Sequence, residues 1–248
     1  MRGLLLLGVF TASCLVVAAA DPPAGPAKLQ GVWHSPADAK VPVRVIVLGD
    51  KVGYMIGDVA ANPPVPGASF VGLTRAKFAE AGDKQQAELM IAKDYTRKVE
   101  FRVEKDGLVL GVDKAEHPLR RANTRDGDPA AKPLAGTWTI AEVGAKGMSA
   151  PGKDAGLESL SFAGDRYVLK GVGGKELLNS YYRAGAAKDG RVELDVFGLK
   201  ADPTITALVE VKGEALTLAQ PLRPGGPRPA GFDTVVADIF LIRATRAK

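Results

Sequence analysis

The chain carries the same short pattern twice, and this duplication constrains its fold more than any other feature. Leu29–Trp33 and Leu134–Trp138 both follow Leu-x-Gly-x-Trp, and they hold the only two tryptophans of the chain. The order of the features that follow each pattern predicts two tandem copies of one domain. Those features are paired apolar segments around Gly-Asp (Val43–Ile56 and Leu160–Leu169), a hairpin-like segment (Phe101–Leu110 and Val209–Leu218) and similar ends (Leu119–Ala122 and Leu241–Ala244).

Within each copy, charged and apolar residues alternate over short stretches such as Lys98–Val103, Arg191–Val196 and Val209–Lys212. Successive side chains of a strand point to opposite faces, so this period predicts strands with one apolar face and one charged face in water. Lys105–Gly107 and Lys212–Glu214 have the composition of tight turns between such strands.

The chain is also rich in residues that end helices and strands, with 29 Gly and 17 Pro. The only candidate helix, Thr74–Ala81, fits a strand equally well. Each copy has room for roughly six to eight short strands. We expect each to close into a small antiparallel β-barrel, because closure removes the exposed edges of an open sheet.

The repeats set the expected domain boundaries at 28–122 for the first, more divergent copy and 134–244 for the second. Between them, 123–133 is polar, carries two prolines and shows no apolar period, which is typical of a linker. Asp126-Gly-Asp128 resembles the start of a calcium loop, but the later acidic ligand of such a loop is missing.

The N-terminus has the composition of a targeting signal. Arg2 precedes the apolar run Leu4–Val17, and Ala18–Ala20 offers a small-residue cleavage site. We therefore expect residues 1–20 to be a signal peptide and the mature protein to be exported to the periplasm or the extracellular space. An alternative is a lipoprotein anchored at Cys14, the only cysteine. The apolar run is short for a membrane span, which needs about 20 residues.

The formal net charge of +5 is small, and no long basic run concentrates it. A nucleic-acid-binding protein would present a concentrated basic face, so no nucleic-acid partner is expected.

The Gly-x-Trp on a first strand and an Arg near the end of the last strand resemble the pattern of lipocalin-like (calycin) barrels. The resemblance implies that an arginine lies across each tryptophan and helps to close one barrel end, with Trp33 matched to Arg121 and Trp138 to Arg243. The second copy also resembles a family of uncharacterised secreted domains abundant in planctomycete bacteria. The stretches that carry this resemblance are Leu134–Trp138, Gly164–Leu169, Asp202–Ile205, Gly213–Leu218 and Arg228–Phe232. It implies a fold and export, but no activity.

The sequence contains no complete motif for catalysis or metal binding. His34 and His117 are the only histidines and lack acidic neighbours at ligand spacing, so no metal site is expected. The second copy has no histidine and hence no Ser-His-Asp triad. Lys170–Glu176 lacks the spacing and the Ser or Thr of a phosphate loop and is expected to be a hairpin connection. Glu193 and Asp195 are expected on a solvated strand face.

Aromatic residues remain as candidates for a binding site. Those considered are Tyr54, Phe70 and Phe101 in the first copy and Tyr167, Tyr181, Tyr182 and Phe197 in the second. Tyr167, Tyr181 and Phe197 are the predicted ligand-lining residues, and packing in the core is the alternative.

The sequence therefore predicts a non-enzymatic exported binding protein without a cofactor, holding a small apolar or amphipathic ligand or an envelope component at a barrel mouth. The alternative is a structural or protein-interaction module of the cell envelope with solid barrels. A third class, an enzyme whose site one sequence does not reveal, would require convergent carboxylates in a cleft.

Overall fold

The structure is a computed structural model that describes residues 25–57, 68–124, 128–186, 188–198, 203–223, 225–235 and 238–247. The predicted signal peptide at 1–20, Cys14 and Asp126 lie outside the described residues. These residues form two compact units, one that ends at Asn123 and takes in Phe197 and Gly198, and one made of Thr124–Val196 and the residues from Pro203 onward. Short 3-10 helices lie at Ala27–Leu29 (η1), Val172–Gly174 (η2) and Lys188–Gly190 (η3).

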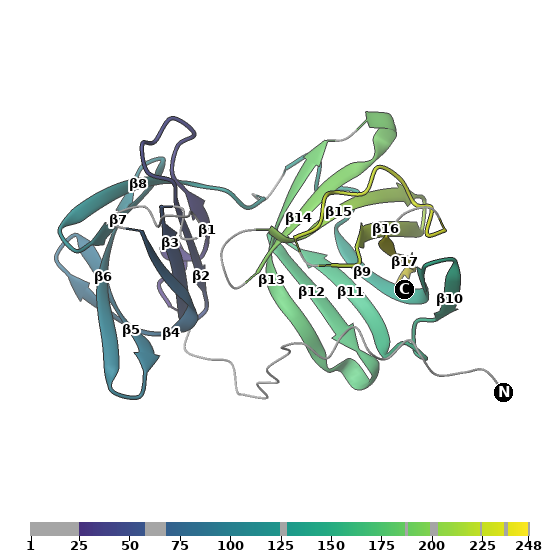
Figure 1. Ribbon diagram of the computed structural model, residues 1–248, viewed down its shortest axis with the longest axis horizontal. Helices are drawn as coiled ribbons and strands as arrows, with labels where there is room; N and C mark the ends of the chain where they lie inside the picture. Colours follow the sequence, from purple (N-terminus) through teal and green to yellow (C-terminus); the bar gives the residue numbers. More distant parts are fainter. Residues whose placement is uncertain are drawn as a thin grey trace. The chain divides into compact units, whose positions relative to one another are not determined.

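In the described part of the first unit, eight strands form a closed antiparallel barrel (Figure 1). Each strand pairs with the next along the chain, and the pairing of β8 with β1 closes the ring. The strands are β1 (Gly31–His34), β2 (Val43–Leu48), β3 (Lys51–Ile56), β4 (Ser69–Ala81), β5 (Lys84–Ala92), β6 (Tyr95–Glu104), β7 (Gly107–Val112) and β8 (Ala115–Arg121). The ambiguous segment Thr74–Ala81 is thus the second half of a strand.

The described strands of the second unit follow the same plan with one addition. The sheet order is β10-β9-β11-β12-β13-β14-β15-β16-β17, and the pairing of β9 with β17 closes it into a barrel (Figure 1). The strands are β9 (Gly136–Ala145), β10 (Met148–Pro151), β11 (Leu157–Ala163), β12 (Arg166–Gly171), β13 (Glu176–Ala186), β14 (Val192–Phe197), β15 (Pro203–Lys212), β16 (Ala215–Pro221) and β17 (Ile239–Arg246). The predicted fold class, all-β with two tandem antiparallel barrels, is confirmed.

The turn residues read from the sequence lie where strands reverse. Gly49-Asp50 joins β2 to β3, and Gly164-Asp165 joins β11 to β12. Lys170–Glu176 covers the end of β12, η2 and the start of β13, so it is the expected hairpin connection.

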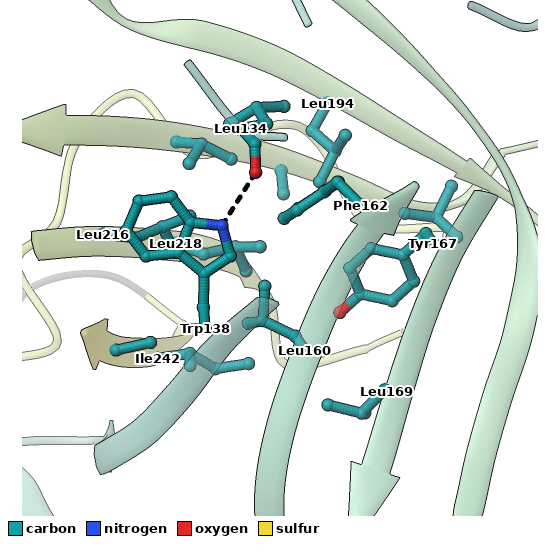
Figure 2. Close-up of a cluster of buried hydrophobic side chains, with 14 of the residues drawn as sticks. Leu134, Trp138, Leu160, Phe162, Tyr167, Leu169, Leu194, Leu216, Leu218 and Ile242 are labelled. Atoms are coloured by element: carbon teal, nitrogen blue, oxygen red, sulfur yellow. Dashed lines mark hydrogen bonds between the residues drawn. The ribbon is translucent and has the colours of Figure 1, made fainter. Parts of the chain in front are cut away.

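Each barrel encloses its own hydrophobic core. The first core includes Trp33, Tyr54, Leu89 and Phe101. The second is built around Trp138, which is fully buried among leucines and Ile242 (Figure 2). Burial of about 25 cal/mol per Å² of apolar surface is the main stabilising contribution of such cores.

Part of the segment predicted as a linker packs into the second unit. Ala131 is a member of the second core. The backbone amide of Ala184 donates to the Thr124 hydroxyl at 2.8 Å, and the Thr124 amide donates to the carbonyl of Tyr182 at 2.8 Å. These residues therefore help to hold β13.

The two ends of the first barrel differ. At one end the N-terminal segment lies over the β2–β3 turn, where the Gln30 side chain exchanges hydrogen bonds of 3.0 and 2.8 Å with the backbone of Gly49. Alternate connections of an antiparallel meander lie at alternate ends. The other end, called the distal end here, is therefore where β1–β2, β3–β4, β5–β6 and β7–β8 are connected.

Candidate functional site

The tryptophan and arginine of the first barrel meet as the resemblance to lipocalin-like barrels implied. Trp33 is the cross-strand partner of Arg121, whose guanidinium carbon lies 5.0 Å from the centroid of the indole ring. The indole N–H donates to the carbonyl of Leu29 at 2.8 Å, and the Arg121 guanidinium donates to the carbonyl of Gln30 at 2.6 Å. The first two positions of Leu-x-Gly-x-Trp thus supply the acceptors.

In the second barrel, the arginine that covers Trp138 is Arg246, and the prediction of Arg243 was wrong. The Arg246 guanidinium carbon lies 4.2 Å from the ring centroid and donates to the carbonyl of Ala135 at 2.6 Å. Arg243 instead forms an exposed ion pair with Glu142 at 2.9 Å. Arg-Ala occurs twice at this end of the chain, and a register shift between Arg243 and Ala244 brings the later arginine opposite the tryptophan.

The glycine of the pattern has a backbone conformation that suits glycine, and a side chain there would also crowd the arginine. Gly31 and Gly136 have φ of 138° and 111°, which other residues rarely adopt. A Cβ on Gly31 would lie 3.2 Å from Cζ of Arg121, and one on Gly136 would lie 3.0 Å from Nη1 of Arg246. The pattern is therefore one structural unit that seals a barrel end.

The three predicted ligand-lining residues do not form a common site. Tyr167 lies in the second core directly after the β11–β12 turn, with its ring 5.4 Å from that of Phe162 (Figure 2). Tyr182 belongs to the core, so its neighbour Tyr181 lies on the outer face of the sheet, where it is also buried and where Arg166 lies 4.7 Å from the centroid of its ring. Phe197 is buried but groups with the first unit. For Tyr167, core packing is the role that the structure gives.

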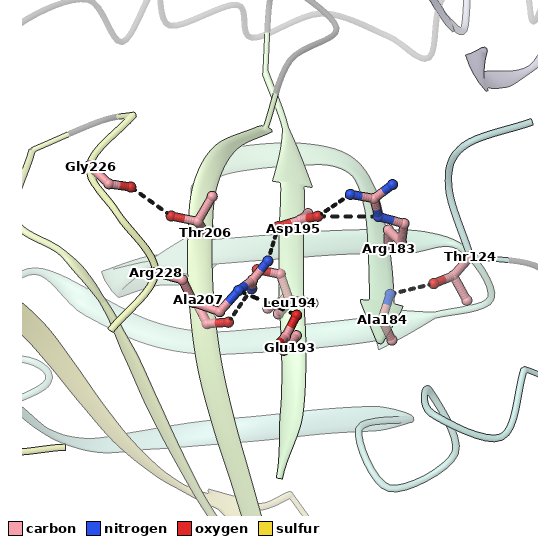
Figure 3. Close-up of polar contacts among 10 residues, drawn as sticks. All are labelled: Thr124, Arg183, Ala184, Glu193, Leu194, Asp195, Thr206, Ala207, Gly226 and Arg228. Carbon is pink, nitrogen blue, oxygen red and sulfur yellow. Dashed lines mark hydrogen bonds and ion pairs between the residues drawn. The ribbon is translucent and has the colours of Figure 1, made fainter. Parts of the chain in front are cut away.

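Asp195 is buried, and the prediction that it lies on a solvated face was wrong. Its carboxylate accepts from the guanidiniums of Arg183 at 2.5 Å and Arg228 at 2.6 Å (Figure 3). Arg228 also donates to the carbonyls of Leu194 and Ala207, at 3.1 and 2.7 Å. Arg228 begins the Arg-Pro-x-x-Phe stretch of the second copy, so this stretch is held against β14 and β15. The first barrel closes without an equivalent.

A polar cluster lies inside the distal end of the first barrel, and sequence reasoning did not identify it. Arg97 is the cross-strand partner of the core residue Leu89, and Ser69 is the partner of the core residue Ile56. Partners in an antiparallel pair share a face, so both side chains point inward. The Arg97 guanidinium donates to the Ser69 hydroxyl at 2.9 Å and forms an ion pair with Asp113.

Tyr54 completes this cluster, which is therefore Tyr54, Ser69, Arg97 and Asp113. Tyr54 is only 1% exposed, and its hydroxyl makes no hydrogen bond of normal geometry. Arg97 lies 5.7 Å from the centroid of its ring. Burial raises the pKa of Tyr54, although the nearby Ser69 hydroxyl and the positive charge of Arg97 partly offset this effect.

Apolar side chains are exposed around the same end. Val41 lies in the β1–β2 connection, Phe70 near the start of β4, Ile91 near the end of β5 and Tyr95 at the start of β6. Tyr95 is 55% exposed and lies two residues before Arg97 on the same face of β6. The inner polar cluster is thus bordered by apolar surface, an arrangement that suits an amphipathic molecule.

The second barrel has apolar residues at the positions that match Tyr54 and Arg97. Tyr54 is reached from Trp33 through Val45 by cross-strand pairing, and Leu169 is reached in the same way from Trp138 through Leu160. The pairing of Phe101 with Leu110 matches that of Val209 with Leu218, which places Ile205 at the position of Arg97. The barrel fold therefore does not itself require Tyr54 or Arg97 at these positions.

The two histidines make none of the contacts described for this cluster. His34 lies on β1 opposite Arg120, and His117 lies on β8 opposite Leu110. Partial burial lowers the pKa of His117. Among the described residues, no group of three or more His, Cys, Asp or Glu side chains is arranged to hold a metal ion. None of the helices described is long and apolar enough to cross a membrane.

No protein-family model matches the chain, and no curated protein is significantly similar to it. Among solved structures, a protein of unknown function from the DUF3598 family of Nostoc punctiforme PCC 73102 is 10% identical with a TM-score of 0.24, over 89% of this chain and 97% of that one. A "Putative DNA polymerase III beta subunit" of Eubacterium rectale is 10% identical with a TM-score of 0.13, over 92% and 60%. TM-scores this low carry no argument about function.

Proposed function

We propose that this protein is an exported, non-enzymatic binding protein that holds a small amphipathic molecule at the distal end of its first barrel. The observation that carries the proposal is the buried Tyr54 hydroxyl without a hydrogen-bond partner. Leaving such a group unpaired costs about 1–3 kcal/mol, and a bound polar group would recover part of this. The exposed Ile91 and Tyr95 nearby supply apolar surface for the rest of the molecule.

A lipocalin-like relationship, including the planctomycete family suggested by the second copy, is part of this proposal. The repeated Trp–Arg contacts at the start and end of each barrel support it. Export is supported by the N-terminal sequence. The intact mass of the exported protein tests this part: we expect a chain that begins at Asp21, whereas a lipid-modified Cys14 would favour the lipoprotein.

Binding at the distal end is tested with decanol, an uncharged amphiphile, by isothermal titration calorimetry. An Ile91→Asp substitution places a charge on the apolar border and is expected to weaken decanol binding at least about tenfold, the cost of desolvating a charged group. The matched control is Val103→Asp on β6, because Val103 is similarly exposed but lies beside the β6–β7 turn at the opposite end. Equal loss in both variants, or no binding to the unmodified protein, would contradict the proposal.

A structural or interaction module of the cell envelope is the second candidate. The observation that favours it is the second barrel, whose interior is occupied by a large cluster of buried side chains that includes Trp138, Phe162 and Tyr167 (Figure 2). A protein with this role would retain its envelope association when the distal end of the first barrel is altered by Ile91→Asp.

A further inference from the structure

We infer that the polar cluster of the first barrel recognises an anionic oxygen-bearing headgroup, a carboxylate or a phosphate monoester, on a single-tailed amphiphile. This inference rests on the proposed function and adds the chemical class of the ligand. It is carried by the position of Arg97 inside the barrel end together with the unpaired hydroxyl of Tyr54.

Arg97 supplies the charge for such a headgroup. Its guanidinium is planar and offers paired donors that match a carboxylate or phosphate. It points to the inner face of β6, and its side chain is only 22% exposed, so an anion bound there would be partly shielded from water. A charge-assisted hydrogen bond in such surroundings is stronger than one on an open surface.

Tyr54 and Ser69 supply neutral donors beside the arginine. The Tyr54 hydroxyl makes no hydrogen bond of normal geometry, and the nearby Ser69 hydroxyl accepts from Arg97. A hydroxyl can accept one hydrogen bond and donate another, so Ser69 can also donate to a headgroup oxygen. A tyrosine hydroxyl has an ordinary pKa of about 10, which burial raises further at Tyr54, so it is protonated at neutral pH and can donate. Donors from three strands thus converge on one region.

Asp113 pairs with Arg97 and would compete with the headgroup. Its side chain is 73% exposed and lies in the tight turn between β7 and β8. An exposed ion pair contributes little free energy, so a ligand anion that also bonds to Tyr54 can displace it. Asp113 also disfavours anions that cannot reach Tyr54.

Comparison with the second barrel favours a role of Tyr54 and Arg97 in binding over a role in folding. It forms the same barrel with Leu169 and Ile205 in place of Tyr54 and Arg97. Burying a tyrosine hydroxyl without a partner weakens the fold, so apolar residues would serve stability better at these positions.

The experiment compares decanoate, decyl phosphate, decanol and decylamine by isothermal titration calorimetry on the full-length mature protein. We expect the two anions to bind more tightly than decanol, and Arg97→Gln to weaken anion binding about tenfold to a hundredfold without changing decanol binding. Tyr54→Phe should weaken anion binding less, and Asp113→Asn should strengthen it. Arg102→Gln is the matched control, because Arg102 lies on the same strand but pairs with Glu116 at the surface.

Each outcome decides one point. Preference for decanoate or for decyl phosphate identifies the headgroup within the class. Equal binding of anions and decanol, or no effect of Arg97→Gln, overturns the anion inference but leaves the binding function standing. Tighter binding of decylamine, lost in Asp113→Asn, overturns it in favour of a cation. Absence of binding by all four compounds overturns both the inference and the proposed function.

Thermal melts show whether each variant is folded. A second test combines Tyr54→Leu with Arg97→Ile, the residues that the second barrel has at these positions. This double variant should keep the barrel fold and lose the preference for anions over decanol. A double variant that still prefers anions would contradict the inference.

Discussion

At the scale of single residues, one end of each barrel is closed by an arginine that lies over a tryptophan ring and donates hydrogen bonds to backbone carbonyls. The contact combines cation–π attraction of about 0.5–2 kcal/mol with charge-assisted hydrogen bonds. Trp138 is fully buried, and its indole N–H is satisfied by the Leu134 carbonyl at 2.7 Å (Figure 2). Trp138→Ala is therefore expected to cost roughly 3–5 kcal/mol, a large part of the stability of a small domain.

The two arginines near the C-terminus should differ in their effect on stability. Arg246→Ala removes the contact with Trp138 and the bond to the Ala135 carbonyl, so the free energy of unfolding should fall by about 1–3 kcal/mol. Arg243→Ala breaks only an exposed ion pair and should cost about 0–1 kcal/mol. Urea unfolding of both variants measures this, and a double-mutant cycle that couples Trp138 to Arg243 and not to Arg246 would contradict the assignment.

Tyr167 should make the second barrel sensitive to alkaline pH. Its burial raises the pKa of the hydroxyl above the ordinary value of about 10. Because the folded state favours the neutral hydroxyl, the contribution of Tyr167 to stability is complete below about pH 10. This contribution is lost as pH rises through the raised pKa. The melting temperature of the Tyr167→Phe variant should therefore fall less between about pH 9 and about pH 11 than that of the unmodified protein. Tyr95→Phe, at an exposed position, is the control, and an equal effect of both changes would count against this account.

At the scale of elements, the carboxylate of Asp195 joins β13 and β14 to the segment that follows β16. Arg183 and Arg228 approach it from two sides, and Arg228 also bonds to carbonyls on β14 and β15 (Figure 3). A buried charge is tolerated only when it is paired and hydrogen-bonded, so the three side chains depend on one another. This explains why the alternating pattern of Arg191–Val196 misled the prediction for Asp195.

Removing the carboxylate should loosen this region. Asp195→Ala is expected to lower the free energy of unfolding by about 1–3 kcal/mol, a range reduced for the partial exposure of both arginines. Glu193→Ala is the neighbouring comparison: it removes only a half-exposed ion pair with Arg228 at 3.6 Å and should change stability by about 0–1 kcal/mol. Chemical denaturation gives both values, and equal effects would show that Asp195 is not the centre of the contact.

At the scale of the whole molecule, each compact unit has its own barrel and its own core. The segment that precedes the second barrel belongs in part to that core, through Ala131, and helps to hold β13, through Thr124. The covalent connection therefore contributes structure to the second unit in addition to joining the domains.

The second unit should fold alone, and its stability should depend on where the fragment begins. A fragment of 124–248 should melt cooperatively with a β-type circular dichroism spectrum. A fragment of 132–248 should be less stable by about 1–2 kcal/mol, because it lacks the hydrogen bonds of Thr124 and the burial of Ala131. Two unfolded fragments would mean that the second core is not self-sufficient.

The sequence by itself determined the all-β fold, the duplication and the main hairpin turns, while the pairing of Trp33 with Arg121 was implied by the resemblance to lipocalin-like barrels. The fold, the duplication and the turns follow from local signals: side-chain alternation along a strand, Gly-Asp at turns and a repeated pattern of residues. Only the tertiary structure decided which of Arg243 and Arg246 meets Trp138, because the register shift between β9 and β17 has no clear signature in composition.

The candidate site also could not be predicted from the sequence alone. Tyr54, Ser69, Arg97 and Asp113 lie on separate strands and turns, and the closed barrel brings them together through pairing over long sequence separations. An arginine in a strand of alternating charged and apolar residues is expected to face water. Only a cross-strand partner that faces the core shows otherwise. That partner, Leu89, is specified by register, and register is decided by the packing of the whole barrel.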